Sequence, residues 1–374
     1  MSLSNRSVPI PEKTATAVVY CEANFGAIDG KTANGLVRHS EKYKIIGVID
    51  SEKTGQDTGT VLSRKVNHIP IFRDLADVLE KNGSVPDYFI FGSAPALGLL
   101  SPHERGVVLE AINLGMNIVN GLQEFLNDDP EFVAASSEMN VELIDVRKPR
   151  AKKELRLFTG RISEIDCVRI AVMGTDSAIG KRTTASILSH ALNDYGLKSV
   201  MVSTGQTGLI QGARYGVALD AVPSQFCSGE LEASIVEAFE HENPDVIVIE
   251  GQGSLSHPAY STSSFILRGS CPQGVILQHA PKRVHRCDFE EMPMPMPMPA
   301  TEINLIQIFS DTKVIGLTIN HENMSDTEVE EAITVYESEL GIPVTDALTR
   351  SPDHLVEMVI NGFPKLAEKL TRRT

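Results

Sequence analysis

The chain has 374 residues, of which 42% are hydrophobic, and this length suits two globular domains better than one. The formal net charge of −15 disfavours nucleic acid and anionic membrane surfaces as partners. The five cysteines include no C-x-x-C pair, so no disulfide framework is expected. The first 13 residues lack the apolar segment of a signal peptide, and the longest apolar runs have the length of a strand. These features predict a soluble, cytoplasmic protein.

The first part of the chain alternates short β-branched runs with helical stretches. This βαβ rhythm predicts an α/β fold in which helices cover both faces of a parallel sheet. Asp50 ends the second predicted strand, where a Rossmann domain bonds a ribose, but no G-x-G-x-x-G is present. The order of these segments resembles that of CoA-binding Rossmann domains of the succinyl-CoA synthetase type. The alternative is a domain that has kept the Rossmann fold but binds no ligand or forms a dimer interface. The strands are predicted at 14–21, 44–50, 69–72, 87–92 and 117–122, and the helices at 31–43, 73–81 and 102–114.

A basic run at 146–156, VRKPRAKKELR, interrupts this rhythm and is typical of a solvated linker. We place a domain boundary there, between a Rossmann-like domain at 1–152 and a P-loop NTPase-like α/β domain at 153–374. Strand and helix patterns resume after it, so the second domain is also expected to contain a parallel sheet. Its strands are predicted at 168–174, 198–204, 245–251, 274–280 and 313–320, and its helices at 182–195, 230–242 and 326–340.

The first strand of the second series runs into a loop with the sequence GTDSAIGKRT, at 174–183. A strand, a glycine-containing turn and a helix start together predict a phosphate site, because backbone N–H groups and the helix dipole favour an anion there. The alternative is a glycine-rich turn with an incidental lysine. The residues expected to bind the phosphate are Gly174, Thr175, Asp176, Ser177, Gly180, Lys181, Arg182 and Thr183.

Arg182 departs from ordinary phosphate loops, which have Ser or Thr after the lysine as a Mg²⁺ ligand. Thr183 comes one residue later, and a step of one residue turns a side chain by about 100° around a helix. A guanidinium cannot ligate Mg²⁺, so Arg182 is expected either to reach a phosphate or to lie outward on the helix. The loop therefore differs from that of an ordinary Mg-nucleotide enzyme.

The GTDSAIGK sequence resembles the loop of dethiobiotin synthetase, and Glu250 and Asn320 end two later strands in the order of that fold. The resemblance implies a P-loop domain of the dethiobiotin synthetase and MinD-like group. Ser203 stands where the synthetase has the lysine that contacts its reacting carbamate, so dethiobiotin chemistry is not expected. Gln206 and Thr207, in the same STGQTG stretch, are candidates for substrate binding.

Glu250 and His257 are the candidate catalytic residues, in the sequence EGQGSLSHPAYS after a predicted strand. Because strand ends line the ligand crevice of open α/β sheets, Glu250 is suited to act as a general base or to hold a metal through water. The alternatives are a carboxylate that caps its own loop and a structural histidine beside proline. Gly251 and Gly253 allow a ligand to approach the backbone closely, which makes them substrate-binding candidates.

A basic segment at 278–287, QHAPKRVHRC, follows another predicted strand in an otherwise acidic protein. His279, Lys282 and Arg283 are expected to bind a carboxylate or phosphate of the substrate, since cationic side chains form strong hydrogen bonds with such groups. This segment is the predicted counter-charge for a small acidic substrate.

A zinc site is the alternative use of this part of the chain, with Cys271, His279, His285 and Cys287 as ligands. Their spacing matches no ordinary zinc pattern, so no metal is expected. The Pro-Met repeat at 291–300 is predicted to be an exposed loop, and a methionine-lined lid is its alternative.

Nearly the whole chain resembles one family, a two-domain group filed as domain of unknown function 1611. The resemblance rests on the sequences at 144–149, 174–183, 250–256 and 278–282. Some members are described as D-glutamate N-acetyltransferases, so it implies transfer of an acetyl group from acetyl-CoA to the amine of an amino acid such as D-glutamate. In this hypothesis the loop holds CoA phosphates without Mg²⁺, the basic segment holds substrate carboxylates, and Glu250 or His257 deprotonates the amine.

Two other functions are compatible with the sequence. An ATP-dependent kinase or ligase acting on a small carboxylate would bind ATP with Mg²⁺. A non-enzymatic nucleotide-binding switch would assemble with nucleotide and turn over no amino acid. A small amino-acid or carboxylate substrate and a homo-oligomeric state are expected, whereas nucleic acid and membrane are not expected as partners.

Overall fold

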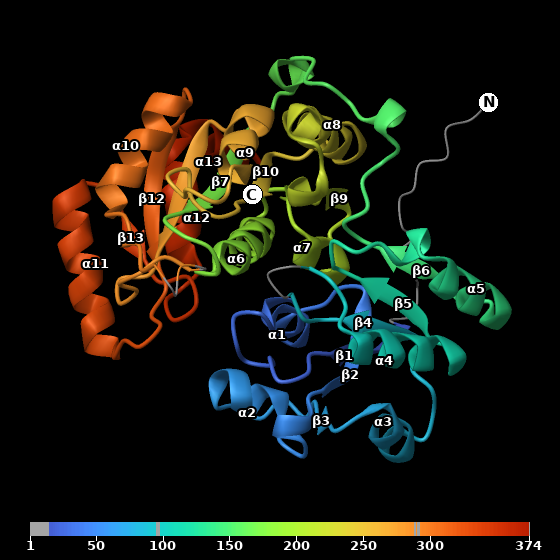
Figure 1. Cartoon of the computed structure of the whole chain (residues 1–374). Coiled ribbons are helices and arrows are strands. Elements are labelled where there is room, and N and C mark those ends of the chain that lie inside the picture. The colour runs from blue at the N-terminus through green and yellow to red at the C-terminus, as the bar shows by residue number, and fades with distance from the viewer. Residues whose placement is uncertain (1–14, 95–97, 288, 290–291, 374) are drawn as a thin grey trace. The chain divides into compact units, whose positions relative to one another are not determined.

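A computed structural model describes residues 15–94, 98–287, 289 and 292–373 of the chain (Figure 1). Three sequence predictions touch residues outside these ranges: the absence of a signal peptide in the first 13 residues, the start of the first strand at Thr14, and the start of the Pro-Met repeat at Glu291.

The chain forms two compact units. The first extends to Arg150 and includes Gln206–Arg214, and the second comprises Ala151–Gly205 together with the chain from Tyr215 onward. This division falls two residues before the predicted boundary. It also assigns 206–214, which the sequence placed in the second domain, to the first unit.

The first unit contains a six-stranded, wholly parallel sheet in the order β3-β2-β1-β4-β5-β6. This is the strand order of the Rossmann fold. The strands are short and buried because helices cover both faces. They are β1 (Ala15–Tyr20), β2 (Tyr43–Ile49), β3 (Ile71–Phe72), β4 (Tyr88–Phe91), β5 (Asn117–Asn120) and β6 (Leu143–Asp145).

Alternate residues of β1 enter different cores of the first unit. Val18 and Tyr20 belong to the core that includes residues of α3, α4 and α5, whereas Ala17 and Val19 belong to the core that includes α1. Thr207 of α7 lies 2.9 Å from the Thr32 hydroxyl of α1, which ties α7 to this unit. The helices are α1 (Lys31–Arg38), α2 (Thr58–Ser63), α3 (Leu75–Asn82), α4 (Pro102–Asn113), α5 (Pro130–Met139) and α7 (Gln206–Gln211).

The second unit contains a seven-stranded parallel sheet in the order β13-β12-β11-β7-β10-β8-β9. β7 lies at its centre and pairs with β10 on one side and β11 on the other. The strands are β7 (Val168–Gly174), β8 (Ser199–Ser203), β9 (Tyr215–Gly216), β10 (Val246–Glu250), β11 (Gly274–His279), β12 (Lys313–Ile319) and β13 (Val344–Thr345).

Helices also cover both faces of the second sheet. Ala171 and Met173 of β7 face the core with α8, α9 and α10, whereas Ile170 and Val172 face the core with α6 and α12. The helices are α6 (Lys181–Asp194), α8 (Ser224–Glu242), α9 (Thr262–Ser270), α10 (Pro299–Phe309), α11 (Asp326–Leu340), α12 (Asp353–Gly362) and α13 (Pro364–Arg373).

The predicted α/β class, with a Rossmann-like unit followed by a P-loop-like unit, is confirmed by the two sheets. Local signals explain some boundaries well: Ser325 and Glu328 form a capping box that begins α11 at its predicted residue. The basic run was predicted to be a solvated linker, but its last residue, Arg156, forms a 2.7 Å ion pair with buried Glu230 of α8. Within the described residues, no helix combines the length and the apolar character needed to cross a membrane.

Candidate functional site

Three loops gather at the carboxyl edge of the second sheet because β10, β7 and β11 are neighbours. The loop at 175–180, called the phosphate loop below, follows β7 and leads into α6. The loop at 251–261 follows β10, and the basic segment continues from β11 through 287. Ligands of open α/β sheets bind at this edge, outside the carboxyl ends of the strands.

Side chains from the segments after β11 and β12 donate to carbonyl groups of the phosphate loop. Arg283 donates from Nη1 to the Ser177 carbonyl at 2.8 Å and from Nη2 to the Ala178 carbonyl at 3.4 Å. Asn320, directly after β12, donates from Nδ2 to the Ile179 carbonyl at 3.2 Å. Three consecutive carbonyl oxygens of the loop are therefore engaged by donors from outside it.

The N–H groups that follow these carbonyls point the opposite way, because trans peptide bonds set C=O and N–H antiparallel. Among the described residues, the backbone N–H groups of Ala178, Ile179 and Gly180 donate no hydrogen bond to the protein. Ala178 and Gly180 have φ values of 51° and 103°, and such alternation of backbone conformation forms anion-binding concavities. The loop thus offers backbone donors to an anion.

Lys181 brings a positive charge to the same place as the first residue of α6. It is buried, and its Nζ donates to the Asp176 carbonyl. Gly174 makes room for it, since a Cβ at that position would lie 2.8 Å from Lys181 Cδ. Thr183, in the first turn of α6, is half-buried. Charge, helix N-terminus and backbone donors together suit a phosphate.

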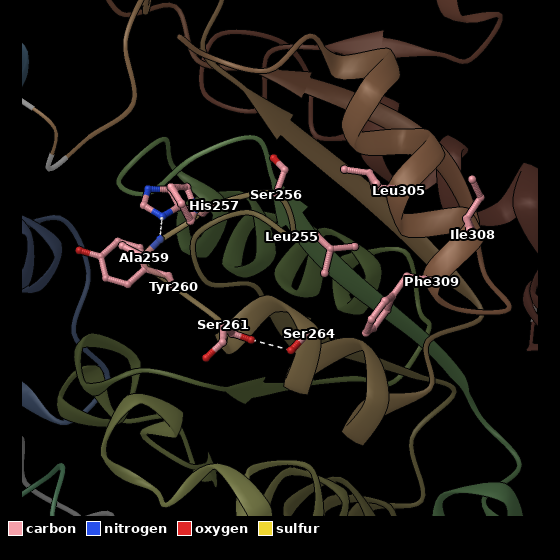
Figure 2. A pocket seen from close by; sticks show the side chains of 11 residues that line it. Leu255, Ser256, His257, Ala259, Tyr260, Ser261, Ser264, Leu305, Ile308 and Phe309 are labelled. Atoms are coloured by element: carbon pink, nitrogen blue, oxygen red, sulfur yellow. Dashed lines mark hydrogen bonds between the residues drawn. The ribbon is translucent and has the colours of Figure 1, made fainter. Parts of the chain in front are cut away.

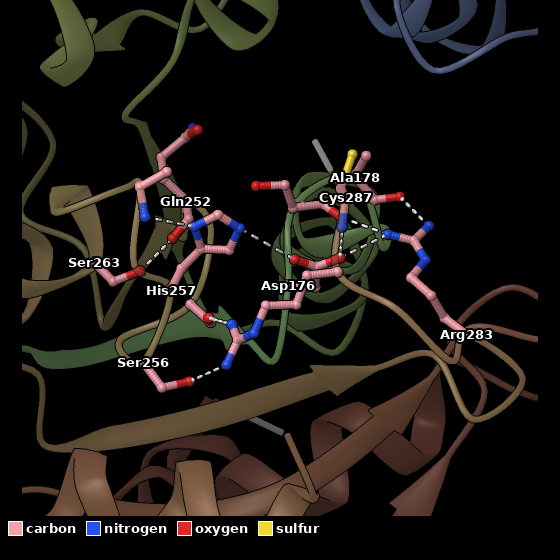
Figure 3. A network of polar contacts seen from close by, with 12 residues as sticks. Asp176, Ala178, Gln252, Ser256, His257, Ser263, Arg283 and Cys287 are labelled. Atoms are coloured by element: carbon pink, nitrogen blue, oxygen red, sulfur yellow. Dashed lines mark hydrogen bonds and ion pairs between the residues drawn. The ribbon is translucent and has the colours of Figure 1, made fainter. Parts of the chain in front are cut away.

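Asp176 is completely buried between the phosphate loop and the basic segment (Figure 3). Its Oδ2 accepts hydrogen bonds from Arg283 Nη1 at 3.1 Å and from the Cys287 backbone N–H at 2.9 Å. Burial lowers the pKa of Arg283, but its hydrogen bonds with Glu322 and Asp176 outweigh burial, so the net pKa is raised. These hydrogen bonds hold the Asp176 carboxylate in place at the edge of the site.

His257 faces Asp176 from the loop after β10. Its Nε2 lies 3.6 Å from Asp176 Oδ1, and its side chain is fully buried. The ring stacks on Tyr260 with centroids 4.6 Å apart. Its Nδ1 accepts a hydrogen bond from the Ala259 N–H at 3.2 Å, which places the proton of a neutral ring on Nε2. In this arrangement His257 is a proton donor toward the site.

Arg182 lies across the ends of β8 and β10. Its Nη1 donates to Ser203 Oγ at 2.9 Å and forms a 3.4 Å ion pair with Glu250 Oε2. The same Glu250 oxygen accepts from the Thr204 N–H at 3.2 Å. Arg182 was expected either to reach a phosphate or to lie outward on the helix. In the structure it instead pairs with Glu250 at the end of β10. The predicted general base is a carboxylate held by a cation.

The basic segment mostly connects loops, and this differs from its predicted role. Arg283 is engaged with the phosphate loop and Glu322, and Lys282 forms an exposed ion pair with Glu328 of α11. His279 is the last residue of β11, where burial lowers its pKa to about 4. Burial therefore favours the neutral ring, and the role of His279 in binding a substrate carboxylate stays a prediction.

His279 instead contacts the first residue of the phosphate loop, since its Nδ1 lies 2.9 Å from the Thr175 hydroxyl. Arg286, another cation of the basic segment, donates to the hydroxyls of Ser254 at 2.9 Å and Ser256 at 2.8 Å. It therefore connects the basic segment to the loop after β10, as Arg283 connects it to the phosphate loop.

The remaining candidates have structural surroundings of their own. A Cβ on Gly251 would lie 2.1 Å from the Val172 carbonyl oxygen, so the neighbouring strand already requires this glycine. Gly253 has a φ of 47°, and a Cβ there would lie 3.8 Å from Ser177 Oγ, so this turn adjoins the phosphate loop. Gln206 and Thr207 belong to α7 of the first unit and stay predictions as substrate-binding residues.

The zinc alternative finds no support among the described residues. No three of the four proposed ligands come together at ligand distance; they are Cys271, His279, His285 and Cys287. The buried cysteines are poor nucleophiles, since burial raises the pKa of Cys227 to about 11.

A cavity of about 560 Å³ lies beside this edge, between the loop after β10 and helices α9 and α10. Figure 2 shows His257 and Tyr260 at one end and Ile308 and Phe309 at the other. Its lining is mostly apolar, which does not suit a phosphate or a dicarboxylate. His257 lines this cavity, and its Nε2 lies 3.6 Å from Asp176 Oδ1.

Comparison with known proteins matches this arrangement to one family over most of the chain. Residues 156–356 match the P-loop domain of DUF1611, a domain of unknown function, and residues 51–149 match its N-terminal Rossmann-like domain. The chain belongs to the DUF1611 family. A crystal structure of a DUF1611 protein from Anabaena variabilis covers 93% of this chain and is itself covered completely, with a TM-score of 0.84 and 29% identity.

Two relatives of this DUF1611 chain carry an activity in their names. A D-glutamate N-acetyltransferase from a Pseudoalteromonas species is 32% identical over 72% of this chain and 80% of its own length. The protein of the same name from Tritonibacter scottomollicae is 29% identical over 72% of this chain and 79% of its own length. These relatives indicate an enzyme of the N-acetyltransferase class.

Proposed function

We propose that this DUF1611 protein transfers an acetyl group from acetyl-CoA to the amine of an amino acid such as D-glutamate. The named activity of the two relatives supports the reaction class. The observation that carries the assignment of the donor is the phosphate loop, whose carbonyls are engaged while three consecutive N–H groups donate to no described residue. CoA is rich in phosphate, and Lys181 adds the charge that such an anion requires.

The reaction forms a C–N bond between the amine and the acetyl carbon, and it breaks the thioester C–S bond. The amine must lose a proton, and the departing CoA thiolate must gain one. Glu250 is the proposed base, because it is a carboxylate at the site edge. His257 is the proposed acid, because its Nδ1 acts as an acceptor and its proton lies on Nε2.

The acceptor in this proposal is a small amino acid or other carboxylate-bearing amine. Arg283 and Lys282 already hold acidic partners, so the residues that bind the acceptor's carboxylates stay a prediction, as does a homo-oligomeric state. The apolar cavity beside His257 is not the proposed place for a dicarboxylate.

The test is an acetyl-transfer assay on the purified full chain with acetyl-CoA and D-glutamate. Release of free CoA thiol and appearance of N-acetylglutamate by mass spectrometry are expected together, in equal amounts. L-Glutamate and a panel of other D- and L-amino acids define the acceptor. Absence of acetylation for every amino acid, together with Mg-dependent ATP turnover, would replace this proposal with the kinase or ligase alternative.

A further inference from the structure

A carboxylate in the phosphate loop and another at the end of β10 are both paired with arginines. Glu250 pairs with Arg182 at 3.4 Å, and Asp176 pairs with Arg283 at 3.1 Å. In ordinary P-loop enzymes an acid at the end of a neighbouring strand and a hydroxyl after the loop lysine hold Mg²⁺. In this chain Arg182 occupies the position of that hydroxyl. Its guanidinium therefore replaces a metal ligand, and its positive charge replaces the charge of the metal.

We propose that the phosphate loop of this protein binds its anion without a divalent metal, because Arg182 supplies the positive charge at the end of β10. The inference rests on the proposed function only in that the loop holds phosphate groups. It predicts a ligand class of phosphate esters and diphosphates that arrive without Mg²⁺. Arg182 is then the residue that decides specificity against metal–nucleotide complexes.

Other side-chain oxygen atoms near the loop already take part in hydrogen bonds within the protein, which makes them less available as metal ligands. The Thr184 hydroxyl, on α6, donates to Gln278 Oε1 at 2.6 Å, and the Thr175 hydroxyl lies 2.9 Å from His279 Nδ1. Asp176 accepts from the Cys287 N–H as well as from Arg283. Mg²⁺ requires several oxygen ligands in octahedral geometry, and the described residues at this edge do not present such a set.

The test compares binding of CoA and of ATP by calorimetry, each in excess EDTA and in excess Mg²⁺, on the full chain. For the wild type, Mg²⁺ is expected to change neither dissociation constant by more than about 2-fold. Arg182→Thr restores the hydroxyl of ordinary loops and releases Glu250 from its cation. This variant is expected to bind ATP at least 10-fold more tightly with Mg²⁺ than with EDTA, and to bind CoA more weakly than the wild type.

Two control variants accompany it. Arg182→Lys keeps a cation and is expected to retain Mg-independent binding, which separates the charge from any general damage to the loop. Arg161→Thr removes an exposed arginine that pairs with Glu240, so it makes the same change of net charge elsewhere in the unit. It is expected to bind both ligands as the wild type does.

The outcomes separate this inference from the proposed function. Wild-type protein that binds its ligand only with Mg²⁺ overturns the inference, even if that protein transfers acetyl groups. Wild-type protein that binds ATP equally with and without Mg²⁺ but ignores CoA overturns the acetyl donor and supports the metal-free loop. An Arg182→Thr variant that folds and shows no response to Mg²⁺ overturns the role of Arg182, and a wild type that binds neither ligand overturns both proposals.

Discussion

The loops that follow the first strand of each sheet have similar positions, but they differ in backbone conformation and in the burial of the lysine that follows them. Both lie at the carboxyl end of a strand in a parallel sheet, and both lead to a helix that starts with Lys-(Thr/Arg) after a glycine. In the loop after β1, the N–H groups of 24–27 donate within the protein, those of 28–30 donate to no described residue, and the lysine that follows is exposed. In the phosphate loop after β7, the carbonyls are satisfied and the N–H groups of 178–180 donate to no described residue.

Side chains from outside the loop after β1 hold its middle residues. Asp50, which a Rossmann domain would use for a ribose, accepts from the Phe25 N–H at 3.2 Å and from Lys53 at 3.0 Å. Asn34 Oδ1 accepts from the Gly26 N–H at 2.9 Å, and Phe25 is buried. A glycine-lysine-threonine sequence alone therefore does not indicate a phosphate site. The phosphate loop is distinguished by its buried Lys181 and by the positive φ values of Ala178 and Gly180. In the loop after β1, Gly30 has a φ of −83° and Lys31 is exposed.

The largest effect expected from this comparison comes from Arg283, which directs the peptide groups of the phosphate loop. Arg283→Gln leaves the buried Asp176 carboxylate without its ion pair and releases the Ser177 carbonyl. Breaking one partner of a buried pair costs about 3–5 kcal/mol, so the free energy of unfolding should fall by that order. Urea denaturation of both proteins measures it, and CoA affinity should fall in parallel.

The neighbouring Lys282→Gln provides the matched control, since Lys282 forms only an exposed ion pair with Glu328. It should leave the urea midpoint unchanged. Equal destabilisation by the two substitutions would show that Arg283 has no special role in the loop.

The sequence predicted the parts of the site that depend on local patterns. The strand ending at Gly174, the helix from Arg182 and the acid at Glu250 follow from hydrophobic runs and from the glycine-containing loop. It did not predict the partner of Arg182, because that contact depends on β10 lying beside β7, whose loop leads into α6. Asn320 was noticed as the end of a strand, but its hydrogen bond to the loop spans 141 residues.

The basic segment shows a second limit of sequence reasoning. Its cations were expected to face a substrate, yet the same residues serve equally well as partners of Asp176, Glu322 and Glu328. His279 belongs to the buried end of β11, which an apolar strand pattern could have indicated. The assignment of α7 to the first unit depends on its contact with α1, which periodicity does not reveal.

Substitution of one lysine in each loop tests the comparison directly. Lys181→Ala should weaken acetyl-CoA binding by roughly 10- to 100-fold, because a hydrogen bond to a charged group contributes about 1.5–3 kcal/mol. Lys31→Ala, at the corresponding position after Gly30, removes an exposed lysine that follows the loop after β1 and should leave binding unchanged. Calorimetric titration of both variants measures the difference. A loss that appeared only in Lys31→Ala would place the ligand in the first unit.

The smallest expected effect concerns His279, whose ring contacts the Thr175 hydroxyl of the phosphate loop. Burial lowers its pKa to about 4, below the usual 6.5, so the unfolded chain binds a proton at a higher pH than the folded one. The stability contributed by the neutral ring is therefore fully present above pH 6.5 and is lost as pH falls towards 4. Linkage gives a loss of about 2 kcal/mol between pH 7 and pH 5.

His279→Gln removes the titrating ring and keeps a side chain that can bond the Thr175 hydroxyl. Urea midpoints at pH 7, 6 and 5 should fall less steeply for this variant than for the wild type, because linkage acts only through a group whose proton affinity changes on folding. His68→Asn, which removes an exposed histidine of the first unit, should retain the wild-type slope. If His279→Gln also retained the wild-type slope, the folded protein would accommodate a charged His279. The residue that contacts Thr175 of the phosphate loop would then be able to carry a positive charge.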